Sequence, residues 1–294
     1  MSVILGFIGL GVMGEPMCRN LAAKSGARIL ARDLASRPLE RLVAHGVTAA
    51  DLATIARDAE VIFLSLPSGD QVAAVCQGAG GLIETAKPGQ TVVDLGTSPP
   101  RLARDLEAAF AARGAVFADA PVARTRQAAE AGTLSIMVGG SQETFERIRP
   151  LLACFASEIA HCGGAGAGQV VKILNNLVLF QTVAALSEAR ALALGAGVDP
   201  QTLFDAFANG SADSFALRNH GRKSILPQTF PEQAFSTRYA LKDLRYALEI
   251  AVESGVDLPG GRRVESLFDT AIARGFGDQY WPVISRLVGD GADG

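Results

Sequence analysis

Residues 3–14 read Val3-Ile4-Leu5-Gly6-Phe7-Ile8-Gly9-Leu10-Gly11-Val12-Met13-Gly14, a short apolar run that leads directly into three spaced glycines. A helical pattern follows and ends at Ser25-Gly26. A strand, a G-x-G-x-x-G loop and a helix in this order are the context of a dinucleotide-binding site. The helix that starts after Val12 and Met13 would then direct its free N–H groups at a pyrophosphate. The alternative is a glycine-rich turn that binds nothing.

An acidic residue follows the next apolar segment. Residues 28–32 read Arg-Ile-Leu-Ala-Arg and end on Asp33, about 20 residues past the glycines, where dinucleotide-binding chains place a ribose-binding carboxylate. Such a carboxylate repels a 2′-phosphate, so we expect NAD(H) to be preferred. Arg32 and Arg37 stand close by and leave NADP(H) possible. Alternatively, Asp33 only caps a turn.

Apolar strands and helical patterns continue to alternate over the first half of the chain. The strands are expected at 61–66, 91–95, 115–120, 135–140 and 158–161. This order predicts an α/β domain with a Rossmann-type, doubly wound parallel sheet. Ligands of such sheets bind beyond the carboxyl ends of the strands, so Leu66, Pro67 and Thr97 are predicted to line the cofactor site. Ordinary turn residues are the alternative.

Glycines at 163, 164 and 166 separate this half from a second half with no strand pattern. We therefore predict a dinucleotide-binding domain over 1–163 and an all-helical domain for substrate and oligomer contacts over 164–294. A long helix is expected first, at 166–194, and further helices at 200–208, 215–224, 235–254, 261–274 and 282–288.

The long helix is apolar except for one narrow arc. Lys172, Asn175 and Asn176 share that arc, because residues three and four apart lie on one helix face. Such a lysine can be functional, or it can sit at the edge of a buried helix and reach water. The apolar residues Val178, Leu179 and Phe180 are expected to be exposed unless something covers them. That pattern favours a homodimer or homotetramer.

Composition excludes several classes of protein. The 294 residues carry a net charge of −3 and no basic run, which disfavours nucleic-acid binding. No run of ~18 apolar residues predicts a membrane span, and the N-terminus lacks signal-peptide features. Cysteines and histidines have no metal-ligand spacing, so no metal site is expected and the thiols should be reduced. We expect a cytoplasmic enzyme.

The motifs together resemble the β-hydroxyacid dehydrogenases, which include 3-hydroxyisobutyrate dehydrogenase, tartronate semialdehyde reductase and succinic semialdehyde reductases. The resemblance covers nearly the whole chain. It rests on residues 6–17 (GFIGLGVMGEPM), 119–122 (DAPV), 132–134 (GTL) with Gly139-Gly140, 172–176 (KILNN) and 242–244 (KDL).

The resemblance implies a role for each motif. Lys172 corresponds to the family's general acid and Asn176, one turn on, would orient its ammonium group. Asn175 would bind the substrate, and Lys242 would contact the cofactor. In such enzymes hydride passes between C4 of the nicotinamide and a carbonyl carbon while an acid protonates the carbonyl oxygen.

Two motifs depart from the family pattern. The family usually has Ser-Gly-Gly after Asp-Ala-Pro-Val, and this chain has Ala123-Arg124-Thr125. The usual Asp-x-Ser-Thr reads Asp94-Leu95-Gly96-Thr97. The Arg-Thr pair is similar to that of the 3-sulfolactaldehyde reductase subgroup, and a guanidinium suits a multi-oxygen anion. Val122, Ala123, Arg124 and Thr125 are therefore expected to hold the anionic end of the substrate, unless Arg124 points to solvent.

Three rival functions remain at this stage. A non-catalytic dinucleotide-binding scaffold has no need of Lys172. An imine reductase usually has another residue in place of that lysine. The 6-phosphogluconate dehydrogenases share the layout but need a much longer helical domain.

Overall fold

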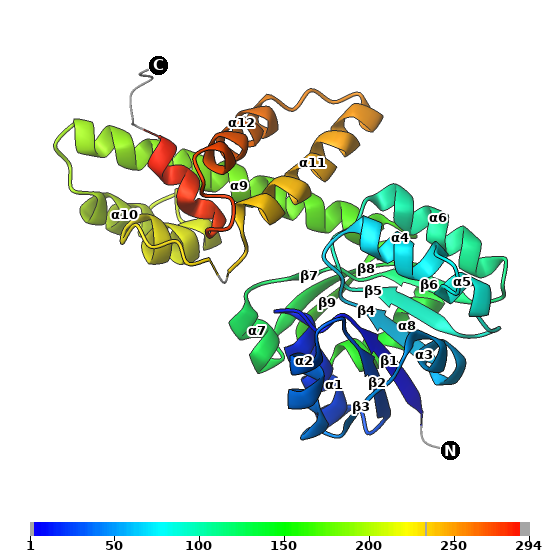
Figure 1. Ribbon diagram of the computed structural model, residues 1–294. Helices are drawn as coiled ribbons and strands as arrows, with labels where there is room; N and C mark the ends of the chain where they lie inside the picture. Colours follow the sequence, from blue (N-terminus) through cyan, green and yellow to red (C-terminus); the bar gives the residue numbers. More distant parts are fainter. Residues whose placement is uncertain (1–2, 233, 289–294) are drawn as a thin grey trace. The chain divides into compact units, whose positions relative to one another are not determined.

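The computed structural model describes residues 3–232 and 234–288, drawn in colour in Figure 1. The chain divides into two compact units, residues 1–172 and 173–294. The predicted boundary at residue 163 lies nine residues before this division, which falls within a helix, α9 (Ala167–Gly195).

The first unit is built on one sheet with strand order β3-β2-β1-β4-β5-β6-β8-β7, and β9 pairs with β8. Its strands are β1 (Ile4–Ile8), β2 (Arg28–Arg32), β3 (Val47–Ala49), β4 (Val61–Leu64), β5 (Thr91–Asp94), β6 (Val116–Asp119), β7 (Val122–Ala123), β8 (Leu134–Gly139) and β9 (Ala156–Gly163). The neighbouring strands from β3 to β6 are all parallel. After β3 the chain returns past β2 and β1, so that β4 pairs with the free side of β1. This is the predicted Rossmann-type, doubly wound sheet.

The far edge of the sheet is not parallel throughout. Strand β8 runs antiparallel to both β6 and β7, while β9 is parallel to β8. The connection from β6 to β8 contains only β7 and the short α7 (Arg126–Ala131). Because β7 within this connection itself pairs with β8, the chain turns back along the sheet edge and β8 runs antiparallel, unlike the all-parallel sheet predicted.

Side chains of the central strands alternate between two cores. Leu5, Phe7 and Phe63 face a core that includes Met17 of α1 (Gly14–Lys24) and Phe145. Neighbouring positions of the same strands face the opposite core, which is covered by α3 (Leu52–Asp58), α4 (Gly69–Gln77), α5 (Leu82–Thr85) and α6 (Pro100–Ala111). The other helices of this unit are α2 (Ser36–Val43) and α8 (Gln142–Leu152). Strands buried on both faces explain the continuous apolar runs in the sequence.

The second unit is helical, as predicted. After α9 it comprises α10 (Pro200–Ala208), a π-helical segment η1 (Leu217–Ile225), α11 (Thr237–Ser254), α12 (Pro259–Ala273) and a 3₁₀ segment η2 (Trp281–Leu287). The sequence predicts an ordinary helix at 215–224, where the structure has the wider η1. Within η1, Gly221 lies against the ring of Phe204, and a side chain there would crowd that ring.

The core of the helical unit is centred on Phe180. Its ring lies 4.8 Å from that of Trp281 and 5.4 Å from that of Phe268, both edge-on. Phe180 is therefore covered within this chain, by α12 and η2, and it is buried. Val178 does remain exposed and Leu179 is half-buried.

By length and composition alone, α9 is apolar enough to cross a membrane. The same test is passed by core helices, and α9 buries Ile173, Phe180 and Val183 completely. This packing accounts for part of its apolar composition, while Val178 and Leu192 stay exposed.

Candidate active site

The glycine loop after β1 has the form that a pyrophosphate requires. Gly9 has a φ of +94°, and a side chain there would overlap the carbonyl group of Ser65. A side chain on Gly14 would overlap the carbonyl group of Gly9, so the start of α1 packs directly on the loop. Gly11, in contrast, faces open space. The tight turn, the close helix contact and the space for a ligand each coincide with one glycine.

The N-terminus of α1 is suited to bind an anion. Met13 is the N-cap residue of this helix, and its side chain makes no hydrogen bond to the helix. Val12, just before it, is exposed. The N–H groups of a helix's first turn, together with its dipole, attract phosphate groups. These residues therefore fit a dinucleotide.

Asp33 lies at the carboxyl end of β2, next to the glycine loop. Its Oδ2 accepts the N–H of Leu10 at 2.5 Å, and its Oδ1 accepts the N–H of Ala35 at 2.8 Å. The carboxylate thus holds the loop in place, and each oxygen retains a lone pair for a ribose hydroxyl. Turn capping and ribose binding, the two interpretations of the sequence, are compatible at this residue.

The other predicted cofactor residues of the first unit follow strands β4 and β5. Leu66 is half-buried, Pro67 is exposed and Thr97 is buried. In a parallel sheet these positions lie at the same edge as the glycine loop.

A buried polar network at this sheet edge fixes the start of α9. Asp119, at the end of β6, accepts the N–H of Gly166 at 2.7 Å and that of Gln169 at 2.8 Å. The Gln169 side chain in turn accepts the N–H of Ser98 and donates to the carbonyl oxygen of Gly96. The first turn of α9 is therefore bonded to the ends of both β5 and β6.

Close packing makes this network possible. A side chain on Gly139 or Gly168 would overlap the Asp119 carboxylate. Burial raises the pKa of Asp119, and the backbone N–H donors oppose that rise. The hydrogen bonds that the two N–H groups donate favour the ionised form of this carboxylate.

Lys172 lies one turn beyond Gln169 on α9, about 4.5 Å further along the helix axis. The side chain is half-buried. The network around Asp119 thus sets the position of the Lys172 backbone relative to the sheet edge that carries the cofactor residues.

The predicted substrate loop joins β7 to α7. Arg124 is exposed, but it does not point freely into solvent. Its Nη1 donates to the carbonyl oxygen of Thr133 at 2.6 Å and to Oγ of Ser157 at 3.0 Å. Its Nε and Nη2 bond to none of the residues that the structure describes. One edge of the guanidinium is therefore fixed, and the other can receive an anion.

The backbone at Arg124 is unusual. Its φ is +87°, in the left-handed region that favours glycine. The position is also the one at which the related pattern Ser-Gly-Gly has a glycine. Thr125 follows as the N-cap of α7 and accepts the N–H of Ala128 at 3.4 Å. Val122 and Ala123, in β7, are half-buried.

The substrate loop is braced against the cofactor helix. Asn20 of α1 donates to the carbonyl oxygen of Ala129 in α7 at 3.0 Å. Lys24, one turn later, donates to the carbonyl oxygen of Cys154 at 2.9 Å. Hydrogen bonds thus join α1 both to α7, which follows the predicted substrate loop, and to the segment after α8.

The remaining predicted residues belong to the helical unit. Asn176 is only 2% exposed and donates through Nδ2 to Asp243 at 2.8 Å. Asn175 donates to Oδ1 of Asn176 at 3.2 Å. Lys242 pairs with the other oxygen of Asp243 at 3.1 Å and lies 4.3 Å from the centre of the Tyr239 ring. Asp243 therefore holds both a predicted catalytic amide and a predicted cofactor lysine.

Three residues of these networks were not assigned a role from the sequence: Asp119, Gln169 and Asp243. Asp119 and Asp243 do stand within the recognised motifs, and Asp119 ends a buried strand. Their burial was the missing information. Among residues 3–232 and 234–288 no group of histidine, cysteine or acidic side chains could hold a metal ion. Burial raises the pKa of the Cys18 thiol to about 12, which suits an inert core residue.

Comparison with known proteins agrees with this geometry. Residues 4–164 match the NAD binding domain of 6-phosphogluconate dehydrogenase, and residues 166–284 match the NAD-binding domain of NADP-dependent 3-hydroxyisobutyrate dehydrogenase.

Individual relatives span the whole chain. The 2-(hydroxymethyl)glutarate dehydrogenase of Eubacterium barkeri is 37% identical, over 97% of this chain and 95% of its own length. The 3-sulfolactaldehyde reductase of Escherichia coli is 34% identical, over 97% and 95%. A structure of Mycobacterium tuberculosis 3-hydroxyisobutyrate dehydrogenase with L-serine superposes with a TM-score of 0.88 at 30% identity, over 98% and 99% of the two chains.

The fold and the matched domains define an NAD(P)-dependent oxidoreductase that acts on CH–OH groups. The chain belongs to the β-hydroxyacid dehydrogenase family, the family of 3-hydroxyisobutyrate dehydrogenase. A non-catalytic scaffold, one of the rival functions, is thereby set aside.

Proposed function

We propose that this protein is an NAD(H)-dependent dehydrogenase that interconverts a short anionic hydroxy acid and its semialdehyde. The leading substrate pair is 3-sulfolactaldehyde and 2,3-dihydroxypropane-1-sulfonate. 3-Hydroxyisobutyrate and succinic semialdehyde are the next candidates.

The observation that carries the choice of substrate is the placement of Arg124. Its guanidinium is fixed on one edge by Thr133 and Ser157, and its other edge is available. A planar pair of N–H donors matches two oxygens of a sulfonate or carboxylate. The overall identities, 37% and 34%, do not separate relatives that act on different acids. The loop is therefore the better guide.

Lys172 is proposed as the general acid and base. In the direction of reduction, the bound nicotinamide supplies a hydride to the carbonyl carbon. Lys172 donates a proton from Nζ to the carbonyl oxygen, so that an alcohol forms and a neutral amine remains, which solvent reprotonates. In the reverse direction Lys172 accepts the hydroxyl proton. Asn175 and Asn176 follow it by three and four residues, on the same face of α9.

The cofactor proposed is NAD(H), because Asp33 follows β2 beside the glycine loop, where dinucleotide-binding chains carry a ribose-binding carboxylate. A carboxylate there repels the phosphate of NADP(H) and accepts the ribose hydroxyls of NAD(H). Arg32 is half-buried and Arg37 is exposed. Asp33→Ala is expected to narrow the preference for NADH over NADPH in kcat/KM.

We also propose a homodimer or homotetramer. On α9, Val178 is 65% exposed and Leu192 is 75% exposed, an unusual arrangement for large apolar side chains of one helix. Light scattering coupled to size-exclusion chromatography would give the mass, and a monomer at micromolar concentration would contradict the proposal.

A substrate screen tests the function directly. NAD- and NADP-linked oxidation would be measured with 2,3-dihydroxypropane-1-sulfonate, 3-hydroxyisobutyrate, 4-hydroxybutyrate, glycerate and L-serine. We expect the highest kcat/KM with the sulfonate and NAD. A higher kcat/KM with any of the carboxylates would reject the sulfonate assignment, and no turnover with the whole panel would reject the substrate class.

A further inference from the structure

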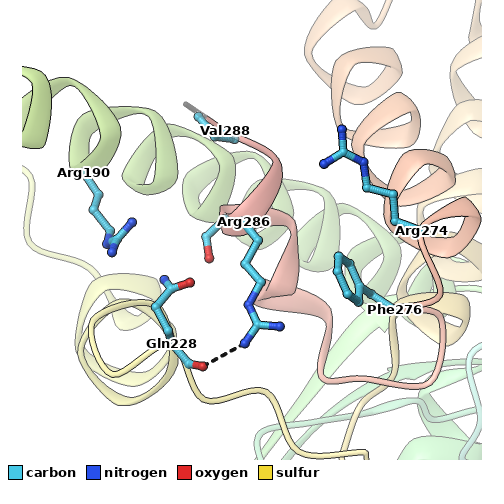
Figure 2. Close-up of a pocket in the computed structure, with 7 residues that line it drawn as sticks. Arg190, Gln228, Arg274, Phe276, Arg286 and Val288 are labelled. Atoms are coloured by element: carbon cyan, nitrogen blue, oxygen red, sulfur yellow. Dashed lines mark hydrogen bonds between the residues drawn. The ribbon is translucent and has the colours of Figure 1, made fainter. Parts of the chain in front are cut away.

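The helical unit contains a cavity of about 320 Å³ that none of the predicted active-site residues lines. Figure 2 shows its residues, which come from α9, the segments that follow η1 and α12, and η2 with the residue after it. They are Arg190, Gln228, Arg274, Phe276, Ser285, Arg286 and Val288. Three are arginines, and none of the described lining residues is acidic.

The guanidinium group of Arg286 lies in this cavity and contacts two aromatic rings and one carbonyl group. Its guanidinium carbon lies 4.9 Å from the centre of the Phe230 ring and 5.8 Å from that of Phe276. Nη2 donates to the carbonyl oxygen of Gln228 at 3.2 Å, the bond drawn in Figure 2. Gln228 itself has a φ of +52°, which only a few non-glycine residues adopt. The charge is thus positioned by cation–π contacts and one carbonyl group, without a carboxylate partner among the described residues.

Two further polar groups of the cavity lack hydrogen bonds. Nε of Arg190 and Oγ of Ser285 are buried and bond to none of the residues that the structure describes. Ser285 as a whole is 2% exposed. Buried polar groups are nearly always hydrogen-bonded, and leaving each without a partner costs ~1–3 kcal/mol. A ligand that accepts hydrogen bonds would remove both deficits.

We propose that this cavity is a binding site for a small oxyanion, a phosphate or carboxylate group. An oxyanion accepts from Arg190, Arg286 and Ser285 together and offsets the positive charge of the two guanidinium groups. The volume is near the lower end of the range for small-molecule sites, roughly 300–1,000 Å³, so a small ligand fits. The site is separate in sequence from the proposed substrate loop at Arg124, and it does not depend on the proposed substrate.

The oxyanion can come from solution or from this chain, since Asp290 and Asp293 follow Val288 in the sequence. Isothermal titration with inorganic phosphate separates the two sources. The titration would use the full chain with saturating NADH, so that the dinucleotide loop is filled. The wild type would be compared with Asp290→Asn/Asp293→Asn, which removes the internal carboxylates.

We expect saturable binding of one phosphate per chain in the wild type, or only in the double variant if the internal carboxylates occupy the site. Ser285→Ala is expected to weaken that binding by ~10-fold, the scale of a hydrogen bond to a charged group. This variant removes an unbonded hydroxyl, so it should fold at least as well as the wild type. Arg190→Met is expected to weaken binding by at least ~10-fold.

Arg218→Met is the matched control, because Arg218 is exposed in the same unit and pairs with Asp213. It should leave phosphate affinity unchanged. Absence of binding in both the wild type and the double variant would overturn the proposal. Binding that Ser285→Ala and Arg190→Met leave unaltered would also overturn it.

Discussion

Arg124→Gly separates the contribution of Arg124 to substrate binding from its contribution to stability. The backbone there has a φ of +87°, which costs a non-glycine residue ~1–2 kcal/mol and glycine nothing. Glycine in turn loses about 0.4–1 kcal/mol through the greater freedom of the unfolded chain. The two exposed bonds to Thr133 and Ser157 are lost as well, at ~0.5 kcal/mol each. These terms nearly cancel, so the free energy of unfolding should change by less than ~1 kcal/mol.

Substrate binding should change far more. Loss of a charge-assisted contact with a sulfonate removes ~1.5–3 kcal/mol, which raises KM for the anionic substrate by ~10-fold or more. Urea denaturation would give stability, and initial rates at saturating cofactor would give kcat and KM. Arg124→Ala sharpens the comparison, since it loses the guanidinium and keeps the strained φ. It should be ~1 kcal/mol less stable than Arg124→Gly, with the same KM.

Arg126→Ala is the control for net charge. Arg126 is exposed two residues away and pairs with Glu130 at 2.9 Å. The KM of Arg126→Ala for the anionic substrate should match that of the wild type. An unchanged KM in Arg124→Gly would remove Arg124 from the substrate site. An equal rise in Arg126→Ala would show that the loop acts only through its overall charge.

Three other changes test the rest of the site and the helical core. Lys172→Ala should lower kcat by at least ~100-fold while the NADH affinity, followed by fluorescence, stays the same; retained turnover would reject Lys172 as the acid. Asp243→Ala removes the buried hydrogen bond from Nδ2 of Asn176 and should cost ~1–3 kcal/mol in urea denaturation. Glu253→Ala, at an exposed position of the same helix, should change stability by less than ~0.5 kcal/mol. Burial lowers the pKa of His220 from 6.5 to about 4, so the unfolded chain binds a proton before the folded one does as the pH falls. Unfolding free energy should therefore drop by up to about 3 kcal/mol between pH 6.5 and pH 4, and His220→Gln, compared over the same pH range, should lack this part of the drop.

The sequence predicted the fold because local patterns and burial agree in the first unit. Strands such as β1 and β4 are buried on both faces, and their apolar runs are therefore continuous. The glycine loop was also readable, since Gly9 and Gly14 are required by backbone geometry rather than by distant side chains. The positive φ of Gly9 and the contact of Gly14 with Gly9 both arise within one βα unit.

Contacts between distant segments could not be predicted in the same way. Phe180 was expected at the surface unless covered, because periodicity shows which residues are apolar, not which elements cover them. Asp243 and Asn176 are 67 residues apart, and their hydrogen bond follows from the packing of α11 on α9. The antiparallel β8 was missed because pairing direction depends on the connection before it. Function resides largely in such long-range contacts, so the motifs indicated the residues without their partners.

The carboxylate of Asp119 has a consequence for dissecting the chain. A fragment that ends at residue 163, at the glycine cluster, would lack Gly166 and Gln169, whose N–H groups Asp119 accepts. It would leave a buried carboxylate with two of its N–H donors missing. A fragment that ends at residue 172 keeps both donors. The smallest part of this chain able to fold as a nucleotide-binding unit therefore includes the beginning of the helix that carries Lys172.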